Sequence, residues 1–318
     1  MRPENLLLLR HRSEKCTVGC PVLDRCLNGG VPCRSITEFV GESGSGKTQL
    51  CLQLALSAQL PSSHGGLSAS SIFIHTEFHF PFRRLHQLSG AFRTSHPDLP
   101  DPCDRVFVRA VHSADELLHL IPTIETFLVY SRSRWRPVRI VVIDSIAALF
   151  RSDFENTGSD LRRRSSLFFG ISGGLRRLAK RFGLAVVVTN QVVDFIGDGD
   201  VRVGNLSDGL YSSGRRVCPA LGLAWAHCVN SRVFLSRDED GPVRRRRMSV
   251  VFAPHLPHSS SQFLIKGEGV FGVEDIQPEP DKTWFGWDLP LFRKGWSLLM
   301  SSNPTISGNF PQSMVGHV

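Results

Sequence analysis

The octapeptide at residues 41–48 constrains the fold of this chain more than any other feature. It reads G-E-S-G-S-G-K-T and matches in full the phosphate-binding pattern G-x-x-x-x-G-K-[ST]. A β-branched run at residues 36–40 precedes it, and an apolar helical pattern at residues 47–60 follows it. A strand, a glycine-rich turn and a helix in this order surround phosphate with backbone N–H groups and a helix N-terminus. The sequence therefore predicts a P-loop, because a chance glycine-rich turn would not explain the flanking strand and helix.

The residues of this loop have separate expected roles. Gly44 and Gly46 let the backbone curl so that successive N–H groups point inward. Lys47 is expected to meet the β- and γ-phosphates of ATP, and the Thr48 hydroxyl is expected to ligate Mg²⁺. The predicted nucleotide-binding residues are Gly41, Glu42, Ser43, Gly44, Ser45, Gly46, Lys47, Thr48 and Gln49.

A second element of nucleotide chemistry ends the apolar strand predicted at residues 138–143. Asp144 follows directly, at the carboxyl edge of the sheet, where ligands of open α/β folds bind. Together with Thr48 it is predicted to hold Mg²⁺. Without the P-loop, an N-cap of the following helical turn would be an equally ordinary role for this aspartate.

Two further polar residues follow strands at the same edge. Glu77 comes after the strand predicted at residues 71–75, and we expect it to orient or deprotonate the attacking water. Gln191 comes directly after residues 184–190, and its amide both donates and accepts hydrogen bonds, which suits a sensor of the γ-phosphate. Both are predicted catalytic residues, although spacing alone fits ordinary surface residues equally well.

Strand and helix patterns alternate through the first two thirds of the chain, which is typical of β-α-β units and a mostly parallel sheet. The predicted strands are residues 36–40, 71–75, 105–109, 138–143 and 184–189, and the predicted helices are residues 47–60, 82–92, 114–129 and 161–182. After Gly222, short runs predict antiparallel hairpins. These runs are residues 232–236, 248–252, 261–266 and 269–273. The predicted fold class is α/β, with helices on the sheet and hairpins at its end.

One main domain is expected, because 318 residues with 41% hydrophobic residues can bury a sizeable core. We divide the chain into an N-terminal extension at residues 1–16, a core at residues 17–273 and a tail at residues 274–318. The tail is rich in Pro, Ser, Asn and Gly, a composition that repays ordering entropy poorly, so disorder is predicted. Trp284, Trp287 and Trp296 could instead dock on the core or on a partner.

Composition also bears on partners and compartment. The chain has 37 Lys and Arg against 29 Asp and Glu, and its formal charge of +8 favours polyanionic partners. Its 8 cysteines form no C-x-x-C pair, so buried, reduced thiols are expected. No apolar run fits a signal peptide or a membrane span, and we expect a soluble protein of a reducing compartment.

Five segments occur here in the order found in the eukaryotic RecA-type recombinases. They are G-E-S-G-S-G-K-T-Q-L, Q-L-P-S-S-H-G-G, H-T-E-F, V-V-I-D-S-I-A-A-L-F-R and V-V-V-T-N-Q-V. Over residues 17–273 the chain resembles this family, which implies a RecA-like P-loop ATPase core, ATP and Mg²⁺ as cofactors, Glu77 as catalytic carboxylate and Gln191 as γ-phosphate sensor. The resemblance also implies a nuclear role in homologous-recombination repair of double-strand breaks and crosslinks, and in meiotic recombination.

Departures from the family pattern indicate a paralogue rather than a strand-exchange recombinase. Strand-exchange members carry a small helical domain and a linker with an aromatic-x-x-Ala plug ahead of the core, and too few residues precede Ile36 for that domain. The family's polar cap reads Asp-Ser-Pro, whereas this chain has Phe252-Ala253-Pro254. The short N-terminus and the segment A-P-H-L-P-H resemble a plant recombinase paralogue, which implies a heterodimer with another paralogue as partner.

In RecA-type proteins, the regions after the strands that end here at Asp144 and Gln191 touch single-stranded DNA. The second of these, residues 192–217, is long, glycine-rich and basic, which is uncommon unless a loop is functional or disordered. Arginine suits phosphate because its planar fork donates two hydrogen bonds at once. The predicted DNA-binding residues are Arg162, Arg163, Arg164, Arg202, Arg215 and Arg216. For the first three, the solvated start of a helix is the alternative.

Two functions stay open at this point. The first is a weak DNA-dependent ATPase whose nucleotide state controls its affinity for single-stranded or branched DNA. The second is a scaffold subunit that binds nucleotide to stabilise a paralogue heterodimer and hydrolyses little. A P-loop kinase or a helicase fits less well, because the sequence has no lid-like arginine motif and no appended helicase domain.

Overall fold

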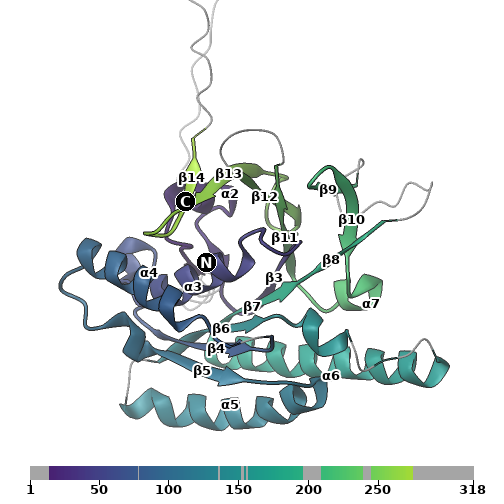
Figure 1. Cartoon of the computed structure of the whole chain (residues 1–318). Coiled ribbons are helices and arrows are strands. Elements are labelled where there is room, and N and C mark those ends of the chain that lie inside the picture. Colours follow the sequence, from purple (N-terminus) through teal and green to yellow (C-terminus); the bar gives the residue numbers. More distant parts are fainter. Residues whose placement is uncertain are drawn as a thin grey trace, which may run out of the picture. The chain divides into compact units, whose positions relative to one another are not determined.

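Figure 1 shows the computed structural model of the chain. The structure describes residues 14–77, 79–134, 137–151, 154, 157–195, 209–238 and 245–274. The chain divides into two units, Met1–Asp275 and Ile276–Val318, and every described residue belongs to the first. Most of the predicted extension and nearly all of the predicted tail, with its three tryptophans, lie outside the described residues. The proposed domain boundaries therefore stay predictions.

A large sheet forms the centre of the described part of the chain. Its nine strands lie in the order β14-β13-β12-β11-β3-β7-β6-β4-β5. The parallel strands are β3 (Ser35–Gly41), β4 (Ser70–His75), β5 (Val106–Ala110), β6 (Val138–Asp144), β7 (Ala185–Asn190) and β11 (Ser231–Arg237). The antiparallel strands are β12 (Arg246–Phe252), β13 (Ser260–Ile265) and β14 (Val270–Val273). The predicted fold class is confirmed.

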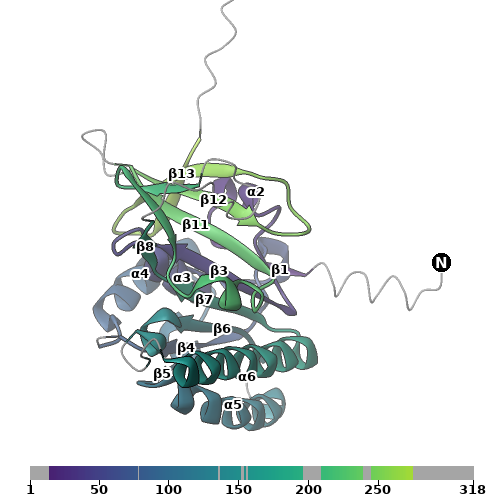
Figure 2. The ribbon, with the colours of Figure 1, turned by 90° about the vertical axis from the view of Figure 1, so that its right-hand side faces the viewer.

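Helices cover both faces of this sheet (Figures 1 and 2). On one face lie α3 (Lys47–Ser57) and α4 (Phe82–Ser95), and on the other lie α5 (Ala114–Arg134) and α6 (Gly158–Phe182). Side chains alternate along each strand, so Val142 of β6 joins the first core cluster and Val141 joins the second. Strands buried on both faces read as continuous apolar runs, which is why residues 138–143 could be identified from the sequence.

The segment after Gln191 differs from the prediction of one long loop. Its described parts form a small antiparallel sheet of β8 (Val192–Asp194), β10 (Arg215–Pro219) and β9 (Leu210–Ser212). Ser213 (φ +48°) and Gly214 (φ +66°) make the turn between β9 and β10. Two-residue turns with positive φ match the twist of a hairpin. The prediction of a loop is therefore wrong at both ends of residues 192–217, where strands form instead. Arg202 lies outside the described residues.

Several short elements complete the described core. They are β1 (Lys15–Cys16), β2 (Val31–Pro32), α2 (Pro21–Cys26), α7 (Gly222–Ala226), η1 (Ser62–His64), η2 (Pro102–Arg105) and η3 (Ala147–Phe150). The cysteines are all unpaired, and all except Cys103 and Cys218 are buried, which confirms the expected thiols. Within the described ranges, no helix has the length and apolar character needed to cross a membrane.

Candidate nucleotide-binding site

The P-loop curls between the end of β3 and the start of α3. Gly44 (φ +76°) and Gly46 (φ +104°) hold left-handed backbone, which is costly for any residue with a Cβ. Gly46 is the N-cap of α3 and offers no capping side chain, so the first-turn N–H groups of the helix face the loop. A Cβ at Gly46 would also lie 3.1 Å from Ile265 Cδ1. The helix end and the curled backbone together provide the donors and the positive dipole end that suit phosphate.

Lys47 is buried at the first position of α3. Its ammonium donates to the carbonyl oxygens of Gly41 (2.7 Å) and Glu42 (2.8 Å). Burial lowers the pKa of Lys47, and the negative charges of Asp144, Glu77 and Glu42 oppose that shift. The lysine is thus held over the mouth of the loop by neutral acceptors, which charged phosphate oxygens can replace with stronger hydrogen bonds.

Asp144 stands at the carboxyl end of β6, beside the start of α3. Its Oδ2 accepts from the Thr48 hydroxyl at 2.7 Å, and its Oδ1 accepts from the Thr189 hydroxyl at 2.5 Å. It does not cap the next helical turn, since Ile146 holds that position without a side-chain cap. A carboxylate and a hydroxyl in contact beside a phosphate loop are hard oxygen ligands of the kind that Mg²⁺ takes. These two side chains would hold the ion.

Glu77 and Gln191 meet at the same edge of the sheet, although 114 positions separate them in the chain. The Gln191 amide donates to Glu77 Oε1 at 3.1 Å and Oε2 at 3.4 Å. Arg151 donates to Glu77 Oε1 at 2.9 Å and also to Gln191 Oε1. The sequence indicated the first two residues, but it gave no reason to join Arg151, from the segment after η3, to them.

A pocket of about 550 Å³ gathers these groups. The predicted residues in its wall are Ser43, Gly44, Gly46, Lys47, Thr48, Gln49, Glu77, Asp144 and Gln191. Residues that were not predicted complete the wall, namely Arg84, Ser145, Arg246, Ile265, Lys266 and Gly267. The wall has four basic side chains and only two carboxylates; the basic ones are Lys47, Arg84, Arg246 and Lys266. Ser145 Oγ is buried without a hydrogen-bond partner in the described structure. A polyanion with acceptor oxygens fits this wall.

Arg84 of α4 links the P-loop helix to the turn between β13 and β14. Its Nε donates to Gln49 Oε1 at 2.6 Å, and its two terminal nitrogens donate to the carbonyls of Lys266 and Gly267 at 2.7 Å. The antiparallel end of the sheet therefore contributes one side of the nucleotide pocket. Sequence reasoning missed this, because nothing in residues 82–92 distinguishes Arg84 from a solvated arginine.

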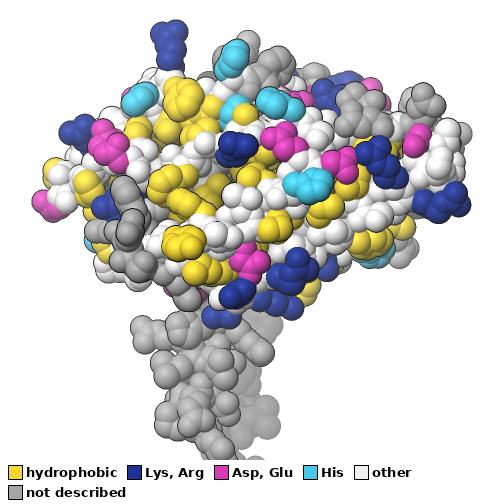
Figure 3. All heavy atoms as spheres, turned by 90° about the horizontal axis from the view of Figure 1, so that it is seen from below, with side chains coloured by type: hydrophobic (Ala, Val, Ile, Leu, Met, Phe, Trp, Pro, Cys, Tyr) yellow, Lys and Arg dark blue, Asp and Glu magenta, His cyan; other side chains and the backbone are white. Residues whose placement is uncertain are grey.

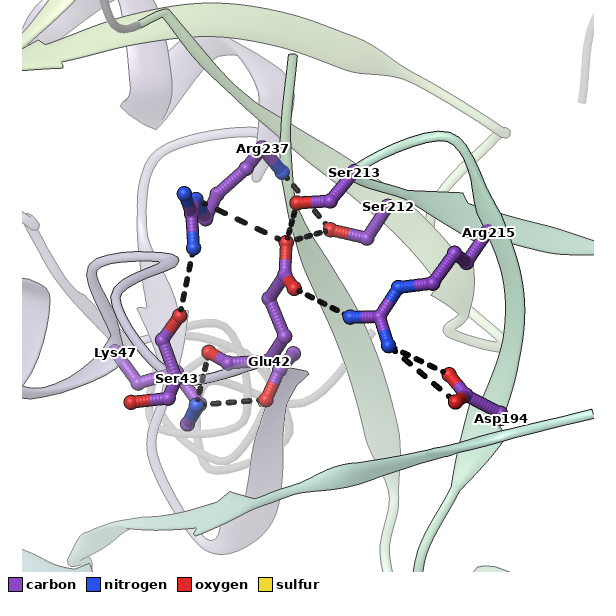
Figure 4. Close-up of polar contacts among 9 residues, drawn as sticks. Glu42, Ser43, Lys47, Asp194, Ser212, Ser213, Arg215 and Arg237 are labelled. Carbon is purple, nitrogen blue, oxygen red and sulfur yellow. Dashed lines mark hydrogen bonds and ion pairs between the residues drawn. The ribbon is translucent and has the colours of Figure 1, made fainter. Parts of the chain in front are cut away.

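Three predicted residues of the loop do not line the pocket: Gly41, Glu42 and Ser45. The Glu42 carboxylate instead reaches the β9–β10 turn, as Figure 4 shows. Ser45 Oγ is buried in the loop without a hydrogen-bond partner among the described residues. The motif therefore marks the loop correctly, but the side chains of its five non-glycine residues face in different directions.

The predicted DNA-binding arginines lie on two separate elements. Arg162, Arg163 and Arg164 belong to the first turns of α6, where Arg163 pairs with Asp115 at 2.7 Å and Arg164 lies over the Phe168 ring at 5.3 Å. Their helical position matches the alternative of a helix start. Arg215 and Arg216 lie on β10, where Arg216 stands over the Phe195 ring at 4.8 Å. The second pair therefore sits on a defined strand beside the P-loop.

Comparison with known proteins agrees with this geometry. The Rad51 family model matches residues 9–273. The chain is 52% identical over 300 residues to the DNA repair protein XRCC3 homolog of Arabidopsis thaliana, which covers 86% of this chain and 98% of that protein. It is 37% identical to DNA repair protein XRCC3 of Mus musculus, over 83% of this chain and 77% of the mouse protein. The predicted resemblance to a plant recombinase paralogue is confirmed, and the chain belongs to the Rad51 family.

Proposed function

We propose that this chain is an ATP- and DNA-binding subunit of homologous-recombination repair that acts in a complex with another recombinase paralogue. The observation that carries the proposal is the convergence of Lys47, Thr48, Asp144, Glu77 and Gln191 in one positively lined pocket. The names of its relatives, DNA repair proteins of a plant and a mammal, support the repair role. Double-strand breaks and crosslinks as lesions, and a part in meiosis within the nucleus, belong to the same proposal.

Different residues of the chain would bind the triphosphate and the metal ion. Backbone N–H groups of the P-loop and the Lys47 ammonium would bind the triphosphate, while Thr48 and Asp144 would hold Mg²⁺. When bound, ATP would supply the γ-phosphate whose presence or loss distinguishes two states, and Mg²⁺ would offset its negative charge. Gln191, which lines the pocket, would contact that phosphate, and β8 begins at the next residue. Because Gln191 directly precedes β8, a change at the pocket would be passed along the backbone to the β8–β10–β9 sheet.

The DNA-binding half of the proposal is tested by the salt dependence of binding. Single-strand affinity falls with salt by about 0.7 log units per log unit of salt for each phosphate neutralised. Replacing Arg215 and Arg216 together with alanine should reduce the slope by about 1.4 if both contact phosphates. Titrations of a labelled single strand in the presence of ATP measure it. An unchanged slope would remove β10 from the DNA interface.

A nucleotide-binding scaffold with little hydrolysis is the second candidate, and the contacts of Arg151 favour it. Arg151 donates to Oε1 of the Glu77 carboxylate and so occupies one of the two oxygens that could accept a proton from water. Single-turnover ATP hydrolysis by the purified complex separates the two candidates. A weak ATPase should lose rate in Glu77→Gln, whereas a scaffold should show the same trace rate in both proteins.

The open edge of the described sheet supports the proposed partner. β5 is its last strand, and a pocket of about 330 Å³ beside it is lined by Phe107, Leu120, Ile124 and Phe127 among others. Figure 3, which views the molecule from the side of α5, shows hydrophobic side chains gathered on this face. An edge strand beside an apolar pocket suits an extended segment with one large apolar side chain. Phe127→Asp should therefore abolish co-purification with the partner, and Phe169→Asp, on α6, should not.

A further inference from the structure

The carboxylate of Glu42 lies on the side of the P-loop away from the nucleotide pocket. It belongs to the phosphate-binding motif, yet it does not line the pocket, and its side chain is only 11% exposed. Figure 4 shows it surrounded by side chains from β10, β11 and the turn between β9 and β10. A largely buried carboxylate at this position needs partners, and its side-chain partners among the described residues lie on β9, β10, β11 and the turn between β9 and β10.

Four groups satisfy this carboxylate. The hydroxyls of Ser212 and Ser213 both donate to Glu42 Oε1, the first at 2.6 Å. Arg215 donates to Oε2 at 3.3 Å, and Arg237 forms an ion pair with Oε1 at 3.9 Å. Burial by itself would raise the pKa of Glu42, but these hydrogen bonds and charges outweigh it and lower the pKa below the usual value. The carboxylate is therefore ionised at neutral pH and fixes the turn between β9 and β10.

The backbone of the same residue is tied to the nucleotide site. Lys47 donates to the Glu42 carbonyl at 2.8 Å and to the neighbouring Gly41 carbonyl at 2.7 Å. An ammonium bonds more strongly to a charged phosphate oxygen than to a neutral carbonyl oxygen, because both partners are then ionised. A triphosphate in the loop would therefore draw Lys47 away from these carbonyls and leave the Glu42 backbone with fewer constraints.

Arg215 is engaged by two carboxylates of the protein itself. One of its terminal nitrogens donates to both carboxylate oxygens of Asp194, at 3.1 and 3.3 Å, and the other donates to Glu42. These are the donors that would form a bidentate contact with a DNA phosphate. Binding of a phosphate at Arg215 therefore requires the arginine to leave Glu42, and the hold of Glu42 on the turn opposes that exchange.

We propose that Glu42 is a positioning residue that couples nucleotide occupancy to the availability of Arg215 for a DNA backbone phosphate. Without nucleotide, its carboxylate holds the Ser212–Arg215 turn and neutralises Arg215. When Lys47 turns to the triphosphate, Glu42 loosens this hold, and Arg215 is released. The inference rests on the proposed DNA-binding function and adds to it the residue that carries the nucleotide signal. Couplings between sites typically change affinity by about 5- to 150-fold, and the effect expected here lies in that range.

The first test compares single-strand affinity with and without a slowly hydrolysed ATP analogue and Mg²⁺, using the full chain. In the wild type, nucleotide should raise the affinity. In Glu42→Gln the nucleotide-free affinity should rise and the ratio between the two states should fall toward one. Asp194→Asn is the matched control, because it also frees Arg215 of a carboxylate but has no bond to the P-loop. It should raise both affinities alike and keep the ratio.

A Glu42→Gln protein that behaves like Asp194→Asn would overturn the proposal, since it would show only the loss of a negative charge. A second measurement needs no DNA and so separates this inference from the proposed function. Amide hydrogen exchange over residues 209–219 should be faster in nucleotide-free Glu42→Gln than in wild type, and nucleotide should accelerate it in wild type only. If nucleotide leaves wild-type exchange in this hairpin unchanged, Glu42 carries no signal, whatever the DNA affinity.

Discussion

Glu38 is a fully buried carboxylate in β3, three residues before the P-loop begins. Its Oε1 accepts from Asn190 Nδ2 at 2.7 Å and from Trp225 Nε1 at 2.9 Å, and its Oε2 accepts from Arg232 Nε. Asn190 precedes Gln191, so this network fixes the end of β7 directly before the residue that we propose as γ-phosphate sensor. A buried charge is tolerated only because its lone pairs are used in this way.

Glu38→Gln should therefore lower the free energy of unfolding strongly. Removal of one partner of a buried ion pair leaves the other uncompensated and typically costs about 3–5 kcal/mol. Urea unfolding followed by circular dichroism measures the effect. Glu125→Gln is the control, because its pair with Arg181 is exposed and should contribute no more than about 1 kcal/mol. Similar small losses in both variants would mean that the network is not tightly closed.

The lowered pKa of Glu42 predicts that the stability of the fold depends on pH. Because its pKa is lowered in the folded protein, its ionised form stabilises the fold above the ordinary carboxyl pKa of 4.5, and this contribution is lost as pH falls through the lower, folded value. Wild type should unfold at higher urea than Glu42→Gln at pH 7, and the two midpoints should converge in the acid range below pH 4.5. A difference that persists unchanged into acid would assign the stabilisation to another group.

For helix α6, the sequence pattern predicted some features and not others. Its apolar spacing identified the buried face, and the Thr157 N-cap explains why it begins at Gly158 rather than at Leu161. Gly173 and Gly174 count equally against a helix by propensity. In the structure they differ, since a Cβ at Gly174 would meet Ile121 of α5 at 2.9 Å, whereas one at Gly173 would meet nothing within 4 Å.

Alanine at these two adjacent positions should act in opposite directions. Gly173→Ala should stabilise the protein by about 0.5–1 kcal/mol, because it removes backbone entropy from the unfolded chain without a clash. Gly174→Ala should destabilise it by about 1–3 kcal/mol, because α5 and α6 must move apart. Thermal unfolding of the two variants provides the comparison. Equal shifts of the same sign would contradict the close approach of the two helices.

The β9–β10 hairpin was not predicted from the sequence. The dipeptide Ser213-Gly214 between short apolar positions was the available signal, but the glycines and charges around it favoured a loop. The contacts that define its position are long-range, from Glu42 on the P-loop and from Arg237 on β11. Local pattern cannot supply such contacts, so the contact between this hairpin and the P-loop became visible only in the structure.

For the molecule as a whole, the parallel core was predictable because its strands are buried on both faces and its P-loop is a specific motif. Asp144, Glu77 and Gln191 could be placed together because the carboxyl ends of parallel strands meet at one edge. Arg84, Arg151 and Arg246 could not, since their roles depend on which distant segments fold beside them. The sequence therefore predicted the P-loop and the polar residues at the strand ends, but it did not predict most of the basic residues that line the pocket.

The central claim is that the loop around Lys47 holds a nucleoside triphosphate, and direct binding tests it. Calorimetric titration of a slowly hydrolysed ATP analogue with Mg²⁺ into the full chain and its partner should show saturable binding. Lys47→Ala should weaken that binding by about 10- to 150-fold, because a hydrogen bond to a charged group contributes about 1.5–3 kcal/mol. Absence of binding in the wild type, or equal binding by Lys47→Ala, would contradict the account.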